Sequence, residues 1–341
     1  MSAATALPLA LTLGEPAGIG PDVTLVAWTR RAAEGLPAFH VVGDAAFLAR
    51  RAAALGLDVP VRRVGPEATA ATFAEALPVV DLEMPVVGAP GRLTPGDASA
   101  VVASIERAVE EVRRGQAAAV VTNPIHKHAL YQAGFTHPGH TEFLGDLAGR
   151  FGAAPDGVAW RPVMMLAGPD LRTVPITVHV ALAQAVRDLT AERIVTTARI
   201  VAADLTRRFG IARPRLAVAG LNPHAGEDGA MGREEIEVMR PAIERLRAEG
   251  LDVVGPLPAD TLFHARARAG YDAALCPTHD QALIPVKTIA FDETVNVTLG
   301  LPFVRTSPDH GTALDIAGTA KAHPGSLIAA LKMAAAMSGA A

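Results

Sequence analysis

Three histidines follow short apolar segments of the chain, at points where a buried strand would end in a loop. They are His179 after residues 173–178, His224 after residues 216–222 and His279 after residues 273–277. One such histidine is more often a surface or core residue than a ligand. Three at equivalent points favour a site, because ligands bind outside the carboxyl ends of the strands in an open α/β sheet. Three neutral imidazoles leave coordination positions open, which is typical of a catalytic divalent metal rather than a structural one.

Two acidic residues are near enough to these histidines in sequence to serve the same site. Asp280 directly follows His279, and Asp260 precedes it. A carboxylate in such a place orients an imidazole or accepts a proton. We therefore expect Asp260 and Asp280 to assist the histidines.

Lys287, Asn296 and Arg305 bring an ammonium, an amide and a guanidinium to the same part of the chain. Such a set suits a doubly anionic substrate, for example a phosphorylated carboxylic acid. The alternative, three unrelated surface residues, fits poorly with their apolar flanking segments. Those segments look too short for ordinary helices, so the sequence predicts that these residues lie in loops.

Two segments have the composition of helix starts or tight turns. Pro138–Glu142 begins a predicted helix, where backbone N–H groups attract anions and His140 and Thr141 add donors. A capped surface helix is the alternative. The glycine-rich segment Gly14–Pro21 lacks the GxGxxG spacing, so we predict no Rossmann phosphate loop there, only a structural turn or a ligand loop.

The elements that must position these residues alternate between apolar strands and amphipathic helices. Strands are expected at residues 8–13, 39–42, 117–121, 163–167, 171–178, 216–220, 251–254 and 273–276. One helix is expected after residue 21, and another follows the strand at 39–42 and ends at about residue 55. Further helices are expected at 97–114, after the capping sequence 122–124, and at 190–209, 234–248 and 326–337. Residues 59–87 show no clear pattern. The alternation predicts an α/β fold with a mostly parallel sheet covered on both faces.

Length and composition set broader limits. A chain of 341 residues is too long for one ordinary core and suggests two domains. A net charge of −4 without a basic tract argues against a nucleic-acid partner. The single cysteine, Cys276, is expected to be a buried, inert thiol in a reducing compartment. No apolar run is long enough to span a membrane and no signal peptide is recognisable, so we expect a cytoplasmic protein without membrane partners.

Longer motifs resemble a known family from Gly14 to the C-terminal helix. They are PGHTEFL at 138–144, GLNPHAGE at 220–227, GPLPADTLF at 255–263, HDQ at 279–281, VNVTLGLP at 295–302 and RTSPDHGT at 305–312. With these motifs the chain resembles the 4-hydroxythreonine-4-phosphate dehydrogenases of vitamin B6 synthesis. The resemblance implies a two-domain α/β/α fold similar to isocitrate and isopropylmalate dehydrogenases, with the active site in the interdomain cleft. Its first domain is expected at residues 1–135 plus 305–341, and its second, with a dimer interface, at 136–304.

The resemblance also assigns roles to residues. His179, His224 and His279 match the family's metal ligands, the third being supplied by the partner subunit of a homodimer, and the metal is expected to be zinc, cobalt or magnesium. His140, Thr141, Lys287, Asn296 and Arg305 match its substrate-binding positions. Asp260, Asp280 and Lys287 are the expected catalytic residues. The cofactor implied is NAD or NADP, whose binding residues are not assigned.

The reaction implied is NAD-dependent, metal-assisted oxidation of 4-phosphooxy-L-threonine to 2-amino-3-oxo-4-phosphooxybutanoate, which decarboxylates to 3-amino-2-oxopropyl phosphate on the route to pyridoxal phosphate. A paralogous dehydrogenase for a phosphorylated sugar acid or an aromatic cis-dihydrodiol is the nearest alternative. A metal-dependent hydrolase without nicotinamide, and a non-catalytic anion-binding protein, are further ones.

Overall fold

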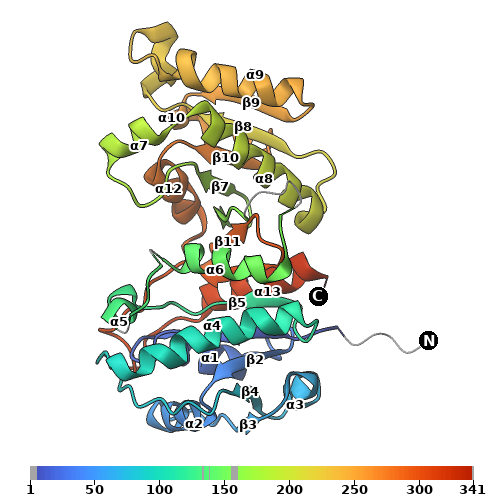
Figure 1. The fold of residues 1–341 in the computed structure, drawn as a ribbon, viewed down its shortest axis with the longest axis vertical. Coiled ribbons are helices and arrows are strands. Elements are labelled where there is room, and N and C mark those ends of the chain that lie inside the picture. Colours follow the sequence, from blue (N-terminus) through green and yellow to red (C-terminus); the bar gives the residue numbers. More distant parts are fainter. Residues whose placement is uncertain (1–5, 133, 138, 155–159, 340–341) are drawn as a thin grey trace, which may run out of the picture. The chain divides into compact units, whose positions relative to one another are not determined.

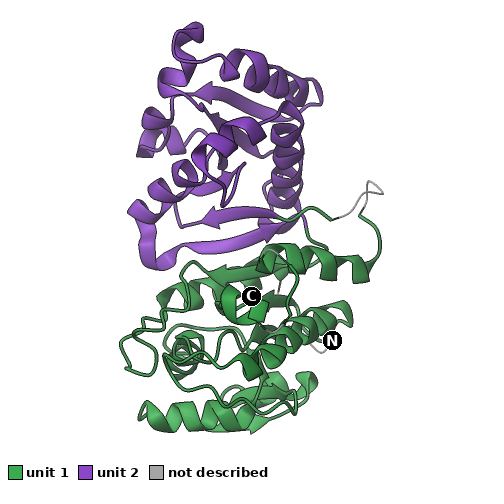
Figure 2. Ribbon diagram, turned by 60° about the vertical axis from the view of Figure 1, so that its left-hand side comes forward, with its two compact units in different colours: residues 1–162, 301–341 green, residues 163–300 purple. Residues whose placement is uncertain are grey.

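The computed structural model describes residues 6–339 except 133, 138 and 155–159. The chain divides into two compact units, residues 1–162 with 301–341 as unit 1 and residues 163–300 as unit 2 (Figure 2). The sequence placed the first boundary at residue 135, whereas unit 1 continues to Pro162. The extension arises because helix α6 (His140–Ala148) buries its apolar side chains in the core of unit 1.

Unit 1 contains a parallel sheet with the strand order β3-β4-β2-β1-β5-β12 (Figure 1). Its strands are β1 (Leu9–Thr12), β2 (Phe39–Gly43), β3 (Val61–Arg63), β4 (Leu77–Asp81), β5 (Ala119–Val121) and β12 (Arg305–Pro308). Every pair within it is parallel. The central strands are fully buried, which is why their sequences are continuous apolar runs rather than alternating patterns.

Helices cover both faces of this sheet. They are α1 (Gly20–Thr29), α2 (Ala45–Ala54), α3 (Thr69–Thr72), α4 (Ala98–Arg113), α5 (Lys127–Gln132), α6 and α13 (Gly325–Ser338), with 3-10 turns η1 (Pro66–Ala68), η2 (Pro95–Asp97) and η3 (Gly149–Phe151). Helix α1 connects β1 to β2, a step toward the β3 edge of the sheet, whereas α4 connects β4 to β5, a step toward β12. Because such crossovers are right-handed, α1 and α4 cover opposite faces.

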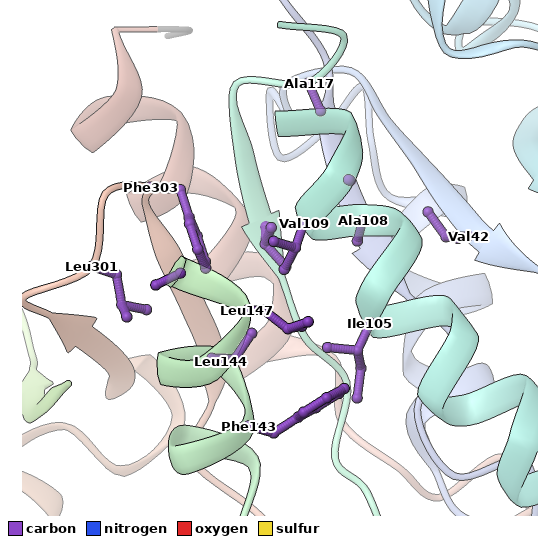
Figure 3. Packing of buried hydrophobic residues seen from close by; sticks show 13 residues of the cluster. Val42, Ile105, Ala108, Val109, Ala117, Phe143, Leu144, Leu147, Leu301 and Phe303 are labelled. Carbon is purple, nitrogen blue, oxygen red and sulfur yellow. The ribbon is translucent and has the colours of Figure 1, made fainter. Parts of the chain in front are cut away.

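The core under α4 explains why α6 belongs to unit 1. Ile105 and Val109 of α4 pack with Phe143 and Leu147 of α6 and with Phe303 just before β12 (Figure 3). All five are at most 6% exposed. This packing fixes the start of α6, where two of the predicted substrate-binding residues lie.

Unit 2 contains a mixed sheet with the strand order β11-β6-β7-β10-β8-β9. Its strands are β6 (Val163–Ala167), β7 (Arg172–Pro175), β8 (Arg215–Ala219), β9 (Asp252–Leu257), β10 (Ala273–Cys276) and β11 (Val295–Leu299). Strands β7, β10, β8 and β9 are parallel neighbours, whereas β6 runs antiparallel to both β7 and β11. The expected α/β fold with a mostly parallel sheet is therefore confirmed.

The helices of unit 2 are α7 (Leu182–Asp188), α8 (Ala191–Phe209), α9 (Arg240–Ala248), α10 (Ala259–Leu262), α11 (Ala265–Arg268) and α12 (His279–Ala290), with the turns η4 (Pro223–Gly229), η5 (Glu235–Met239) and η6 (Phe291–Glu293). The single helix expected at 234–248 is thus a π-helical turn, η5, followed by α9. A π-turn widens the helix and is frequent at functional sites.

Two local expectations were wrong. No helix starts at residues 122–124, because Asn123 is buried and its amide donates to Thr12 O and Thr24 Oγ1 instead of capping. Lys287, Asn296 and Arg305 do not lie in loops. Lys287 belongs to α12, which begins with a capping box of Thr278 and Gln281 and tolerates Pro285 inside it, whereas Asn296 belongs to β11 and Arg305 to β12.

In the part of the chain that the structure describes, no helix is both long and apolar enough to cross a membrane. Cys276 is fully buried in β10, and burial raises the pKa of its thiol far above the ordinary value. The expected inert thiol is therefore confirmed.

Candidate active site

The three predicted histidines follow three neighbouring parallel strands of unit 2. His179 comes after β7, His279 after β10 and His224 after β8, and these strands are adjacent in the order β7-β10-β8. Their carboxyl ends therefore lie at one edge of the sheet, which is where α/β proteins bind ligands.

His179 and His279 lie next to each other at this edge. Their ring centroids are 5.4 Å apart and the ring planes are inclined by 44°. Two imidazoles bound to one tetrahedral zinc ion at about 2.0–2.1 Å would hold their ring centres about 5 Å apart. His279 Nδ1 contacts Asp280 Oδ1 at 2.8 Å, so the carboxylate orients the ring and leaves Nε2 for a metal. The pair fits two ligands of one divalent metal.

His224 lies on the same edge but in an unusual backbone conformation. Its φ of 53° is left-handed, and Ala225, Gly226, Glu227 and Asp228 have positive φ as well. Within the described residues, no three His, Cys, Asp or Glu side chains converge closely enough to hold a metal. One chain therefore brings His279, the ligand expected from the partner subunit, beside His179. The contribution of a partner subunit stays a prediction.

A pocket of about 720 Å³ surrounds the histidine pair. Its polar residues are Thr177, His179, Asp260, Thr278, His279, Asp280 and Gln281, and its apolar residues include Val180, Leu182, Ala185, Phe263 and Ile284. Asp260 and Asp280 thus share a pocket with the histidines, as the sequence suggested, whereas Lys287 and Asn296 are not among the residues that line it.

Lys287 and Asn296 occupy regular elements of unit 2. Lys287 is half-buried on α12, with Nζ 5.7 Å from the centre of the Phe291 ring. Asn296 is half-buried on β11, opposite Leu166 of β6. Their substrate-binding roles therefore stay predictions.

The remaining predicted residues form a cationic group in unit 1. Arg305, the first residue of β12, is 4% exposed, and its guanidinium donates twice to Thr122 Oγ1, at 3.2 Å from Nε and 2.7 Å from Nη2. Burial lowers the pKa of Arg305 to about 10, so the group is still charged at neutral pH. Its planar set of N–H donors matches a phosphate or a carboxylate, which makes it a candidate anion-binding group.

His140 and Thr141 are the first two residues of α6, after Gly139 at the N-cap. Burial lowers the pKa of His140 well below 6.5, and the charges of Arg305 and Lys127 lower it further. His140 Nε2 is buried, and within the described residues no atom hydrogen-bonds to it. A neutral imidazole, a helix start and a guanidinium together favour a phosphate or carboxylate. Pro138, the first residue of this predicted segment, lies outside the described residues.

Lys127 also follows a strand end, and no role in substrate binding was assigned to it from the sequence. Its charge acts on His140, and its Nζ would lie 3.3 Å from a Cβ placed on Gly139, so the ammonium sits at the start of α6. Lys127 directly follows the loop after β5, at the carboxyl end of a central strand, which was a usable signal for it.

The glycine-rich segment Gly14–Pro21 and the residue after it connect to residues 312–318 by hydrogen bonds. Ile19 N donates to Thr312 O at 2.9 Å, and a Cβ on Gly18 would come within 2.8 Å of the same oxygen. Asp22 Oδ2 accepts from Gly318 N at 2.6 Å. The glycines therefore allow residues 312–318 to approach closely, which favours the structural-turn interpretation.

These features define the class of protein: it is an α/β enzyme of two units, and its polar site residues follow the ends of strands. Residues 36–334 match the model of the family described as pyridoxal phosphate biosynthetic protein PdxA. The chain is 58% identical, over 98% of both chains, to 4-hydroxythreonine-4-phosphate dehydrogenase of Bradyrhizobium diazoefficiens. It is also similar to the solved 4-hydroxythreonine-4-phosphate dehydrogenase of Klebsiella pneumoniae, with 37% identity, a TM-score of 0.84 and coverage of 98% and 100%. A terephthalate 1,2-cis-dihydrodiol dehydrogenase from Burkholderia xenovorans is more distant, with 29% identity, a TM-score of 0.61 and coverage of 98% of each chain.

The chain therefore belongs to the PdxA family and is an oxidoreductase.

Proposed function

We propose that this chain oxidises 4-hydroxythreonine 4-phosphate with NAD⁺, giving 2-amino-3-oxo-4-phosphooxybutanoate, which then loses carbon dioxide to form 3-amino-2-oxopropyl phosphate. The observation that carries the proposal is 58% identity over 98% of both chains to a relative of that name. The residues of the two units supply the groups that this chemistry requires.

The histidine pocket of unit 2 suits the reacting end of the substrate. A divalent metal lowers the pKa of a hydroxyl that it binds, and NAD⁺ accepts the hydride from the adjacent carbon. His179 and His279 are the residues of one chain that fit such a metal, with His224 as the third proposed ligand. Asp280 contacts the His279 ring, and Asp260, which lines the same pocket, is the proposed proton acceptor. Zinc, cobalt and magnesium are the candidate metals.

The cationic group of unit 1 suits the substrate's phosphate or carboxylate. Arg305 offers a planar set of donors that matches either anion, and His140 and Thr141 offer a helix start. Lys287 and Asn296 are proposed as further substrate-binding residues, and Lys287 as a catalytic one. Which anion each cation holds is left open.

A homodimer is the proposed assembly. Leu182 and Ile284, which line the histidine pocket, are 69% and 63% exposed. Large apolar side chains gathered at one place favour burial against another chain. A second copy covering them would bring its own residues to the pocket, in agreement with a metal site shared between subunits. We propose the cytoplasm as its location.

The test is the initial rate of NADH formation from NAD⁺ with three substrates. They are 4-hydroxythreonine 4-phosphate, unphosphorylated 4-hydroxythreonine and the cis-dihydrodiol of terephthalate. We expect rapid turnover of the first alone, because the planar donors of Arg305 and the start of α6 match a phosphate group. Preference for the dihydrodiol would contradict the proposal. That alternative is supported by the likeness to the Burkholderia xenovorans enzyme, which acts on such a diol. Absence of NAD⁺ binding in calorimetry would favour a hydrolase.

A further inference from the structure

The turn that carries His224 is held in a left-handed conformation by side chains outside it. Five consecutive residues, 224–228, have φ between 40° and 81°. Non-glycine residues in this region each cost on the order of 1 kcal/mol or more, so such a run persists only where its surroundings enforce it. His224, Ala225, Glu227 and Asp228 are all non-glycine.

The enforcing contacts converge on Asn222, two residues before His224. Its backbone N–H donates to Glu235 Oε1 at 2.7 Å, and its side-chain amide donates to Glu235 Oε2 at 3.0 Å and to Glu234 Oε2 at 2.8 Å. Glu235 thus binds the start of the turn with both carboxylate oxygens. It is 1% exposed, so these bonds are not replaced by water.

Glu235 also faces the middle of the turn. A Cβ placed on Gly226 would lie 2.7 Å from Glu235 Oε2, and Gly226 has a φ of 81°. The carboxylate therefore packs directly against the backbone between His224 and Asp228. Glu235 is the first residue of the π-helical turn η5, whose wider backbone allows the chain to present this side chain inward.

We propose that Glu235 is a positioning residue for His224, acting through Asn222 to hold the imidazole where a divalent metal can be bound. The proposal rests on the proposed function, in which His224 is a metal ligand. Groups that orient metal ligands in this way change metal affinity roughly 10- to 100-fold when they are removed. Removing the Glu235 carboxylate is therefore expected to weaken metal binding itself, which can be measured independently of turnover.

The test is titration of the metal-stripped full-length protein with Co²⁺, measured by calorimetry and by the visible absorption of the bound ion. In Glu235→Gln one carboxylate oxygen becomes an amide that cannot accept from Asn222. We expect its Co²⁺ Kd to rise roughly 10- to 100-fold, with an altered spectrum, at temperatures well below its melting point. The matched control is Glu237→Gln. Glu237 also lies in η5, but its side chain is 58% exposed and paired with Arg233 at 2.5 Å. This variant should bind Co²⁺ like the wild type.

The outcomes separate this proposal from the one on which it rests. A wild-type Kd and spectrum in Glu235→Gln, together with weakened binding in His224→Ala, would overturn the positioning role and leave the metal site intact. Wild-type binding in His224→Ala would instead overturn the metal role of His224. If Glu235→Gln does not fold, Asn222→Ala decides the matter. It removes both side-chain bonds, to Glu234 and Glu235, but keeps the backbone bond to Glu235. A Kd between those of wild type and His224→Ala therefore supports the role, and a wild-type Kd refutes it.

Discussion

The two units present their chemical groups in different ways. In unit 1 the polar groups are buried in the core, where Arg305 is 4% exposed and bonded to Thr122, and His140 begins a helix packed by Phe143 and Leu147. In unit 2 the groups lie on strand-end turns, where His179 and His224 have positive φ and the His279 side chain is 32% exposed. Under the proposed function, unit 1 would supply fixed charge for recognition and unit 2 would supply metal ligands that a partner subunit completes.

His279→Ala gives the largest expected loss and tests the catalytic part of this comparison. Removing one ligand of the His179–His279 pair should lower kcat by about 10³-fold or more, because a metal contributes several kcal/mol of transition-state stabilisation. Steady-state NADH formation measures the loss, and His323→Ala, at an exposed position, is the control. Loss of the native circular dichroism spectrum in the variant would make its low rate uninformative, so the spectrum is recorded with it. A folded, fully active variant refutes the role of the histidine pair.

Arg305→Ala should give a smaller loss that appears in substrate recognition. Loss of a charge-assisted pair of hydrogen bonds costs about 3 kcal/mol, so kcat/KM for the phosphorylated substrate should fall roughly 10²-fold. Arg305→Lys keeps the charge but loses the planar donor set, and it should recover only part of the rate. If both variants bind Co²⁺ like the wild type, the two units have separate roles. Weakened metal binding in Arg305→Ala would show that the division is wrong.

Gln281 connects two of the histidine segments within unit 2. Its Oε1 accepts from Thr278 N at 3.2 Å in the capping box of α12, and its Nε2 donates to Gly220 O at 2.9 Å, at the end of β8. Gln281→Ala should lose about 1 kcal/mol of unfolding free energy and roughly tenfold in Co²⁺ affinity. Gln281→Glu keeps the cap but not the bond to Gly220. Urea unfolding and Co²⁺ titration of both variants separate the two effects, and an Ala variant with unchanged affinity would contradict the connection.

His140 gives the smallest expected effect, a pH dependence of stability. Its pKa is lowered in the folded chain by burial and by Arg305 and Lys127, whereas the unfolded chain protonates near pH 6.5. As the pH falls, the unfolded state therefore binds the proton before the folded state does. The free energy of unfolding decreases as the pH falls below 6.5. Between pH 7.5 and 5.5 the wild type should lose on the order of 1 kcal/mol more than His140→Gln in urea unfolding. Equal losses would mean that His140 titrates normally.

The strands and their carboxyl ends were predictable because buried parallel strands are short apolar runs that stop at polar residues. That pattern located His179, His224 and His279, and it correctly gave the start of α6. Arg305 was singled out as a cation between apolar segments, and the family motifs then matched it to a substrate-binding position. Its burial and its bonds to Thr122 depend on β12 pairing with β5, which brings together residues 183 positions apart.

Other features depend on local competition that a pattern does not reveal. Thr122-Asn123-Pro124 looks like a helix cap, but the Asn123 amide finds better partners in Thr12 and Thr24, which only the fold brings near. The α12 helix was missed although Thr278 and Gln281 form a capping box, because the apolar segments looked too short for a helix. The contacts between Glu235 and the His224 turn require the Glu235 side chain to face inward from the π-helical turn η5. Sequence periodicity does not predict that orientation.

The most direct test of the account is NADH formation from NAD⁺ and 4-hydroxythreonine 4-phosphate by the wild-type full chain, before chelation, after chelation and after adding back zinc, cobalt or magnesium. The account predicts that chelation abolishes the rate and that at least one of these metals restores it in the wild type but not in His279→Ala. A full rate in protein whose metal content has been shown to be negligible would contradict the account.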